Sequence, residues 1–382
     1  MPPTSPKSVV TPTRIVSLVA SGRATTRSAL SRSLGWAPST VSTQLRPPIE
    51  DGVIGEEDIR DGERGRPTRR LSLVRDGSFV VIIDMNVQHA RLGIINTANE
   101  IEARTEMPID VADGPEAVVA AVSQRVDTLL GGTRLGRTLR AVGIAVPGPV
   151  DWRTGKLTLP ARMPGWGGFS LRGWLEQRLE VPVVVENDAN VMAFAEHFAR
   201  DGGNAPTVTI KAGTGISGGV IMDGEIYRGA TSAAGDITHV RMPSAGDLPC
   251  SCGNRGCLET VASGAALVAA LRARGLDVSS TTELVELALA GDPDVTTAVR
   301  AAGAMLGQML CSVANFFNPQ AIYLGGSLAV AEPFVAAVRS QIYQGSHPLA
   351  TSALTIEPAQ TGEDGVLLSL ARMAVTASLQ AA

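Results

Sequence analysis

The chain is poor in aromatic residues, in cysteines and in long apolar runs, and each absence narrows the class of protein. Aromatic side chains make up 4% of the 382 residues, and only four residues are cysteines, three of them within eight positions. Such clustering argues against a disulfide framework. No apolar run approaches the roughly 20 residues of a membrane-spanning helix, and the opening MPPTSPKSVV lacks the apolar core of a signal peptide. We therefore expect a cytoplasmic protein without a membrane partner.

The composition is that of a folded protein whose charge is unevenly spread. Apolar residues account for 44% of the chain and charged residues for 18%, and the length favours two or three domains. Residues 1–75 carry 12 Lys/Arg and 7 Asp/Glu, whereas the remainder carries 21 and 30. A basic N-terminal segment followed by an acidic remainder is typical of a nucleic-acid-binding module joined to a sensor or an enzyme. A basic face that is only exposed to solvent gives the same distribution of charge.

The first fifty residues contain three short helical patterns. Apolar positions recur at helical spacing over 13–20 and over 26–34, where Gly35 ends the pattern. A third helix begins at Pro38, a residue favoured at the first helical position, and buries Val41 and Leu45. Two short helices around a glycine-containing turn predict a helix-turn-helix. Its second helix would present small polar side chains to DNA, namely Ser39, Thr40, Ser42, Thr43 and Gln44.

A basic hairpin is expected after these helices. A strand begins near 53–54, and a polar loop leads through Arg66, Arg69 and Arg70 into a second strand. The hairpin would be the wing of a winged helix, with its arginines on phosphates or in a narrow minor groove. A plain three-helix interaction domain is the alternative. Because proline breaks helices, Pro47-Pro48 predicts that the DNA-facing helix stops near Leu45 or kinks.

From Phe79 onward the chain has an α/β pattern in which one order of strands occurs twice. Strands are expected at 79–84, 90–96 and 101–107, and again at 207–211, 218–222 and 225–227. Each set leads into helices. Two copies of a strand–turn–strand–strand–helix unit predict two lobes that face a cleft. This is the arrangement of actin-like phosphotransferases, which bind nucleotide and substrate between the lobes.

Two groups of residues in this part have the chemistry of a site. Asp188 follows an apolar strand run and precedes a helix, where the helix dipole favours the ionised carboxylate; a simple helix cap is the alternative. One imidazole and three thiolates would complete a tetrahedral metal shell with no open position. We expect a structural Zn²⁺ here, and a reduced, metal-free cysteine cluster is the alternative. The four ligands would be His239, Cys250, Cys252 and Cys257.

Five motifs, each weak alone, occur in an order that resembles the ROK family of repressors and sugar kinases. They are Gly143–Asp151, Glu186–Asn190, Gly213–Gly215 with Gly218-Gly219, Gly235–His239 and Cys250–Glu259. The resemblance implies an α/β protein in which a winged helix-turn-helix precedes a two-lobed, actin-like (ribonuclease H-like) sugar-kinase fold. The implied divisions are 1–75 for the DNA-binding domain, 76–195 for the first lobe and 196–382 for the second. The C-terminal helix would pack on the first lobe or on a partner.

The resemblance also implies roles for the residues of the cleft. In the kinases that resemble this chain, the aspartate at Asp188 accepts the proton of the sugar hydroxyl that is phosphorylated. Asn187, Asp236, His239 and Glu259 would contact other hydroxyls, the carboxylates as charge-assisted acceptors. The family usually has Glu at the position of Asp236 and Gly at that of Thr238. These departures leave the identity of the sugar open.

The decisive departure from the kinases lies after Asp84. The kinases follow this aspartate with Gly-Gly-Thr, whose bare backbone comes close to the ATP phosphates. Here Asn86 and Val87 place side chains in that space, and Gln88 replaces the threonine. The second phosphate loop, Gly213–Gly215, is retained. Because phosphoryl transfer depends on positioning and charge, half a phosphate site predicts no kinase activity and leaves Asp188 as a vestigial base.

These observations favour a transcription regulator, most simply a repressor, that senses a sugar or sugar phosphate between its lobes. DNA half-sites read by winged helices imply a homodimer or homotetramer. An active ROK-type sugar kinase that also carries a DNA-binding domain is one alternative. A ligand-free oligomeric scaffold, with Pro47-Pro48 marking a decayed DNA-binding head, is another.

Overall fold

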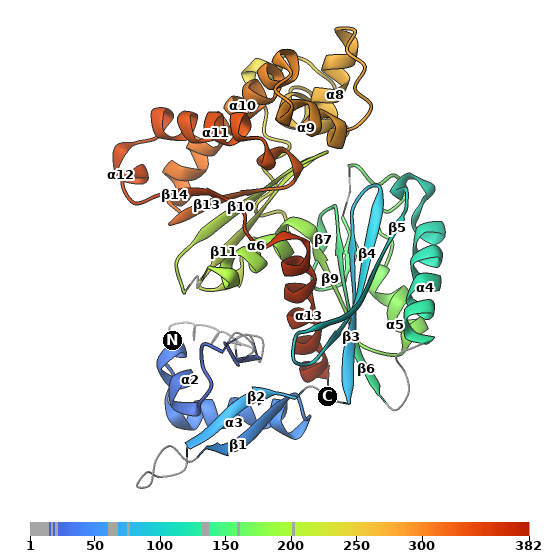
Figure 1. The fold of residues 1–382 in the computed structure, drawn as a ribbon, viewed down its shortest axis with the longest axis vertical. Helices are drawn as coiled ribbons and strands as arrows, with labels where there is room; N and C mark the ends of the chain where they lie inside the picture. Colours follow the sequence, from blue (N-terminus) through green and yellow to red (C-terminus); the bar gives the residue numbers. More distant parts are fainter. Residues whose placement is uncertain are drawn as a thin grey trace, which may run out of the picture.

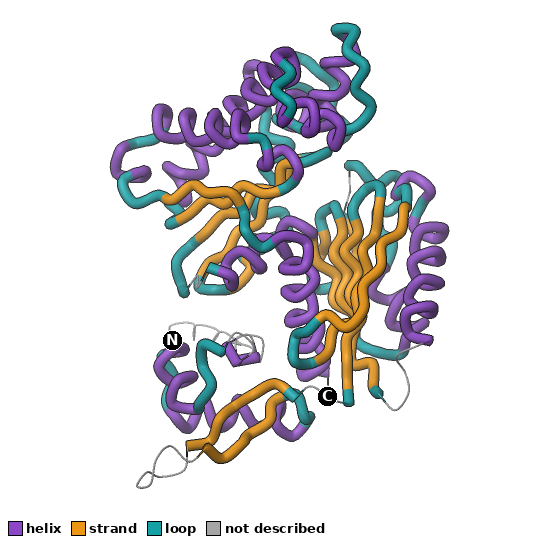
Figure 2. Tube along the Cα trace, in the orientation of Figure 1, coloured by secondary structure: helices purple, strands orange, loops and turns teal. Residues whose placement is uncertain are grey.

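The computed structural model describes residues 15–16, 18–19, 22–59, 68–74, 77–131, 137–158, 161–200 and 203–381. Two five-stranded sheets dominate it, one above the other in the view of Figures 1 and 2, and helices run between them. Among the described residues, no helix is long and apolar enough to cross a bilayer.

The two sheets have the same strand order and the same strand directions, which confirms the repeated scheme expected from the sequence. In each, three antiparallel strands are followed at one side by two parallel strands. The first sheet has the order β5 (Ile101–Pro108), β4 (His89–Asn96), β3 (Ser78–Met85), β6 (Thr138–Val146) and β9 (Val183–Asn187). The second has the order β12 (Glu225–Ile226), β11 (Ile216–Met222), β10 (Thr207–Ala212), β13 (Ala321–Gly325) and β14 (Thr355–Pro358).

The first sheet is buried on both faces, and its central strand shows how. Alternate side chains of a strand point to opposite faces. Phe79, Val81 and Ile83 belong to the core with α4 (Pro115–Gly131) and α5 (Leu171–Leu179). Val80 and Ile82 belong instead to the core with α13 (Gly362–Ala381). The C-terminal helix therefore packs on the first lobe, as one of the two expectations had it.

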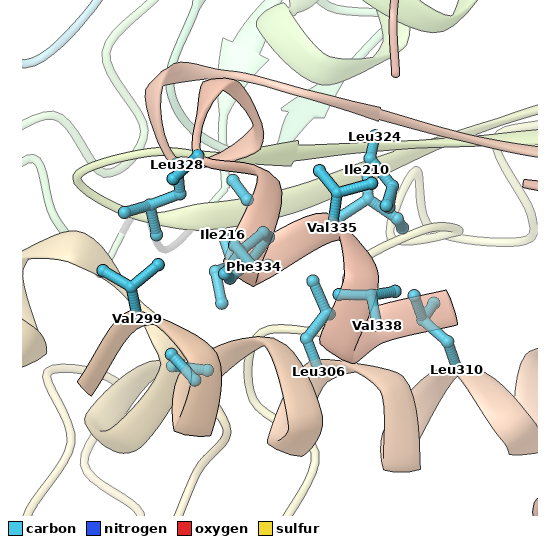
Figure 3. Close-up of a cluster of buried hydrophobic side chains, with 14 of the residues drawn as sticks. Ile210, Ile216, Val299, Leu306, Leu310, Leu324, Leu328, Phe334, Val335 and Val338 are labelled. Atoms are coloured by element: carbon cyan, nitrogen blue, oxygen red, sulfur yellow. The ribbon is translucent and has the colours of Figure 1, made fainter. Parts of the chain in front are cut away.

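Helices cover the second sheet as well. A cluster of buried side chains joins β10 and β13 to α10 (Pro293–Phe317) and α11 (Glu332–Gly345), as Figure 3 shows for Phe334, Val338 and Leu306. The two helices can pack closely because Gly303 has no Cβ atom. A Cβ atom there would collide with the carbonyl oxygen of Phe334. The other α-helices in the described part of the two lobes are α6 (Asp188–Ala199), α7 (Glu259–Ala262), α8 (Gly264–Ala273), α9 (Thr281–Leu289) and α12 (Pro348–Thr351).

The N-terminal residues form a small unit of helices and a two-stranded antiparallel sheet. Thr26 caps α2 (Arg27–Leu34), whose C-cap Gly35 has a φ of 66°. These ends match the sequence expectation, as does the start of α3 (Pro38–Glu50) at Pro38. The strands are β1 (Ile54–Ile59) and β2 (Thr68–Leu73). Of the helix expected at 13–20, four residues are described and are helical.

Of the two alternatives predicted for α3, a stop near Leu45 or a kink, the stop is wrong, because the helix continues through both prolines to Glu50. Proline lacks an N–H, so the helix forgoes two backbone hydrogen bonds there. Three features offset this cost. Pro48 is buried, and the carbonyl oxygens of Pro47 and Pro48 accept hydrogen bonds of 2.9 Å from the amides of Asp51 and Val53.

Candidate functional site

A cavity of about 960 Å³ lies between the two sheets, where β3, β9, β10 and β13 end. All five residues expected to bind a sugar line it, although they come from both lobes and from distant parts of the chain. They are Asn187, Asp188, Asp236, His239 and Glu259. The turn after β3 and the Gly213–Gly215 loop line the same cavity. The structure thus brings the expected groups together.

The start of α6 places two of these residues and distinguishes their roles. Asn187 is the N-cap, since its Oδ1 accepts hydrogen bonds from the amides of Ala189 (3.0 Å) and Asn190 (3.2 Å). Its Nδ2 donates to the carbonyl oxygen of Gly148 at 3.0 Å. Asp188 is the first helical residue, buried, with Oδ1 accepting from the Ala189 amide at 2.8 Å. The capping role considered for Asp188 therefore falls to Asn187.

The expected base, Asp188, is paired with a lysine that no sequence motif singles out. Nζ of Lys211, on β10 of the second lobe, forms an ion pair with Oδ2 of Asp188 at the start of α6. Burial by itself lowers the pKa of Lys211, but the carboxylates of Asp188 and Asp84 outweigh it and raise the pKa above its usual value. The lysine is therefore charged at neutral pH. A lysine inside the buried run Thr207–Ala212 was the available signal.

Asp84, at the end of β3, belongs to the same group of charges. Its carboxyl is buried, and burial raises its pKa although Lys211 and Arg91 act in the opposite direction. Nη2 of Arg91 lies 3.0 Å from Oδ2 of Asp84, and Nη1 of the same guanidinium lies 2.5 Å from Oε1 of Glu363. Charges of both signs thus fill the floor of the cavity.

In the turn after β3, the side chain of Asn86 forms hydrogen bonds with the backbone of the same turn. Oδ1 of Asn86 accepts hydrogen bonds from the amides of Gln88 (2.8 Å) and His89 (2.9 Å). The Asn86 amide in turn donates to the carbonyl oxygen of His89 at 2.9 Å. The backbone N–H groups of Asn86, Gln88 and His89 are therefore all bonded within the turn.

An arginine spans the other side of the cavity. Nη1 of Arg162 lies 3.1 Å from Oε1 of Glu259, and it packs so close to Gly215 that a Cβ atom there would collide with it. Burial raises the pKa of Glu259, and Arg162 and His239 partly offset this effect. Arg162 lies between strands β6 and β9 of the first sheet in the chain, and Glu259 lies between β12 and β13 of the second, so this ion pair also joins the lobes.

The four predicted metal ligands lie within 4.8 Å of one another beside the cavity. Sγ of Cys250 is 3.5 Å from Nδ1 of His239, and the Sγ atoms of Cys252 and Cys257 are 3.7 Å apart. A tetrahedron with metal–sulfur bonds of about 2.3 Å separates its ligand atoms by about 3.8 Å. The donor set and its spacing therefore fit a closed, four-coordinate metal site.

The residues expected to contact DNA are distributed over α3 and β2. Ser39, Thr40, Ser42 and Thr43 are exposed on α3, and Gln44 is half-buried. Arg69 is exposed and pairs with Glu56 (3.2 Å) and Asp58 (3.3 Å). Arg70 is exposed and has no ion pair with another described residue, whereas Arg66 lies outside the described residues.

Comparison with known proteins establishes the family. The sequence profile of the ROK family matches residues 80–376. The chain belongs to the ROK family. It is 27% identical to the xylose repressor of Bacillus spizizenii over 91% of this chain and 90% of that protein. It is 31% identical to the glucokinase of Halalkalibacterium halodurans over 66% of this chain and 81% of that protein.

Solved structures agree on the ROK architecture. A ROK family transcriptional regulator, described as a homologue of the Escherichia coli MLC protein, superposes with a TM-score of 0.77 at 23% identity, over 96% of both chains. The α/β fold expected from the sequence, with actin-like lobes, is thereby confirmed.

The ion pair at the base of the ROK cleft yields a first prediction. Replacing Lys211 with Ala leaves the buried Asp84 and Asp188 without their shared cation. We expect the variant to lose about 2–3 kcal/mol of stability at pH 8, less than a fully buried pair would, because the Lys211 side chain is 30% exposed. The loss should shrink towards pH 5, since Asp84, whose pKa is already raised, takes up a proton as the pH falls.

Urea unfolding of the wild type and the variant at pH 5, 6.5 and 8 measures this difference. Lys156→Ala serves as the control, because Lys156 is exposed on β8 (Lys156–Leu157) and should behave as the wild type does. A K211A variant whose loss of stability is independent of pH would contradict the proposed coupling to Asp84.

Proposed function

We propose that this protein is a sugar-responsive, DNA-binding regulator, most simply a repressor of carbohydrate uptake or catabolism genes in the cytoplasm, and that it does not transfer phosphate. The observation that carries the proposal is the Lys211–Asp188 ion pair beside the self-bonded turn at Asn86. The relatives support it, because the alignment with the xylose repressor spans 91% of the chain and that with the glucokinase 66%.

The ion pair removes the base that phosphoryl transfer needs. A kinase-like Asp188 would have to accept the proton of a sugar hydroxyl, but its Oδ2 already holds the Lys211 ammonium. Its Oδ1 accepts a hydrogen bond from the backbone amide of Ala189 at 2.8 Å, so both carboxylate oxygens are already engaged within the protein. At the turn after β3, the bonded amides and the side chains of Asn86 and Val87 leave little to receive the ATP phosphates.

The same cavity suits the hydroxyl groups of a sugar. Asp188, Asp236 and Glu259 offer carboxylate oxygens to hydroxyl donors, while Lys211 and Arg162 offer N–H donors to hydroxyl oxygens. Asn187 and His239 complete the set that we propose for ligand binding. A sugar that binds between the lobes can shift the protein between two arrangements only by its difference in affinity for them.

We assign DNA binding to the N-terminal unit, within the proposed division 1–75, followed by lobes 76–195 and 196–382. The exposed side chains of α3 would read the major groove, and Arg66, Arg69 and Arg70 would contact the backbone or the minor groove. Two such units in a homodimer or homotetramer would match two half-sites on DNA.

We further assign a structural Zn²⁺ to His239, Cys250, Cys252 and Cys257, whose donor atoms lie within 4.8 Å of one another. The ion would fix the loop that carries His239 and Glu259 at the cavity wall. Substituting Cys252 with Ser should remove the metal and lower the thermal midpoint, because the ligand set is then incomplete. Metal analysis by plasma mass spectrometry checks this.

Cys311→Ser is the matched control for the metal, since Cys311 lies on α10 with its Sγ 3.3 Å from the carbonyl oxygen of Gly307. One zinc per chain in the wild type and in C311S, and none in C252S, is the expected result. Equal zinc content in all three proteins would contradict the assignment of the metal to these four residues.

The test of the function measures DNA binding in the presence of sugars. Duplexes recovered from a random pool by the protein itself would be titrated by fluorescence anisotropy, with D-xylose, D-glucose and glucose 6-phosphate as added ligands. We expect at least one of them to change the DNA affinity. Asp236→Asn should weaken the response to that sugar by about 10-fold or more, because a hydrogen bond to a charged acceptor is lost.

Asp277→Asn is the control, because Asp277 is exposed and lies away from the cavity. It should respond to sugar as the wild type does. Absence of specific DNA binding, or DNA binding that none of these sugars alters, would count against the proposed regulator.

A further inference from the structure

Helix α13 reaches from the cavity to the N-terminal unit. Gly362, Glu363 and Val366, in its first turns, and Thr361, just before it, line the cavity. At its other end, Val375 and Leu379 are buried, in the same apolar cluster as Leu45 of α3 and Leu71 of β2. Figure 1 shows the C-terminal end of α13 beside the N-terminal unit. A helix of this length spans about 30 Å.

A buried carboxylate fixes the chain just before α13. Oε1 of Glu196, a fully buried residue, accepts hydrogen bonds from the amides of Gln360 (2.8 Å) and Thr361 (2.6 Å) and from the Thr361 hydroxyl. Its Oε2 accepts from Nε of Arg200 at 3.0 Å. Glu196 belongs to α6, the helix that begins at Asp188 in the cavity. The segment entering α13 is therefore attached to the helix that carries a proposed sugar ligand.

A second attachment runs directly through the cavity floor. The Arg91 guanidinium lies between two carboxylates, 3.0 Å from Asp84 on β3 and 2.5 Å from Glu363 in the first turn of α13. Arg91, Asp84 and Glu363 all line the cavity. A ligand that approaches Arg91 or Asp84 therefore changes the balance of charge that holds the start of α13.

The N-terminal unit is joined to the same body of the protein. Arg140 on β6 donates from Nη2 to the carbonyl oxygen of Asp51, which caps α3, and from Nε to Oγ of Ser78 at 2.8 Å. The Thr97 hydroxyl donates to the carbonyl oxygen of Val74, just after β2. The unit thus rests on the lobe whose sheet α13 covers, so a shift of α13 reaches it through packed side chains.

We propose that α13 couples occupation of the cavity to the placement of the N-terminal unit, with the Arg91–Glu363 ion pair as the connection at the cavity end. This inference rests on the proposed function. A ligand that is bound better in one position of α13 shifts the protein towards that position, and the apolar cluster that Val375 and Leu379 share with α3 and β2 moves with it. By linkage, DNA changes the sugar affinity by the same factor.

Two neighbouring residues of α13 allow a matched test. Glu363 pairs with Arg91 in the cavity, whereas Asp364 pairs with Arg104 on β5 at 2.8 Å and does not line the cavity. Both side chains are largely exposed, so Glu363→Ala and Asp364→Ala should both fold. Each removes one acidic group from the first helical turn, which equalises the effect on the helix dipole.

The quantity to measure is the ratio of DNA dissociation constants with and without saturating sugar, using D-xylose, D-glucose and glucose 6-phosphate as probes. We expect D364A to keep the wild-type ratio and E363A to bring the ratio at least about 5-fold closer to one. Calorimetry in the absence of DNA gives the sugar affinity of each variant, so that the ratio is measured at saturating sugar for each protein and lost coupling is separated from weakened binding.

The outcomes distinguish the two proposals. A wild-type ratio of one for all three probes would overturn the proposed function, and the coupling with it. A wild-type response that E363A and D364A retain equally would overturn the coupling while leaving the proposed function intact.

Discussion

The ion pair between Lys211 and Asp188 joins the end of β10 in one lobe to the start of α6, which carries the expected base. Two buried carboxylates, Asp84 and Asp188, face the cavity, and ionising both there without a cation would be costly. Lys211 supplies that cation from within the chain. The rest of the cavity floor follows from it, since Arg91 balances the charge that remains on Asp84.

This constraint separates recognition from reaction in one cavity. Groups that can bind hydroxyls line the cavity, while Asp188 is paired with Lys211 and the turn after β3 is bonded to its own Asn86 side chain. Differential stabilisation of a transition state needs preorganised groups that are free to act. In the function that we propose, binding energy therefore shifts the arrangement of the lobes, and α13 connects that arrangement to the N-terminal unit.

Much of the fold could be predicted from the sequence, because the signals were local and strong. The strands expected at 79–84 and 207–211 are β3 and β10, whose ends differ from the expected ones by at most about one residue. Gly35 ends α2 as expected. The cysteine spacing predicted a group of His239, Cys250, Cys252 and Cys257, and these four residues lie together in the structure. The end of α3 was predicted wrongly, because the rule for proline weighs lost hydrogen bonds and not the burial of Pro48.

The charged contacts of the site could not be predicted, because they join residues far apart in the chain. Lys211 pairs with Asp188, 23 positions away, and Arg162 pairs with Glu259, 97 positions away. Arg91 and Glu363 are separated by more than two hundred positions. No local pattern specifies such pairs. The sequence shows that Gly-Gly-Thr is absent after Asp84. It does not show that Oδ1 of Asn86 accepts hydrogen bonds from the backbone amides of Gln88 and His89.

In the function that we propose, the cleft binds sugar without binding or consuming ATP. Calorimetric titration of D-xylose, D-glucose and glucose 6-phosphate into the protein, with and without ATP and Mg²⁺, tests this. We expect that a sugar binds with the same affinity in both conditions and that no ADP forms. Binding of ATP, followed by formation of ADP and a phosphorylated sugar, would contradict it and show that Asp188 still acts as a base despite Lys211.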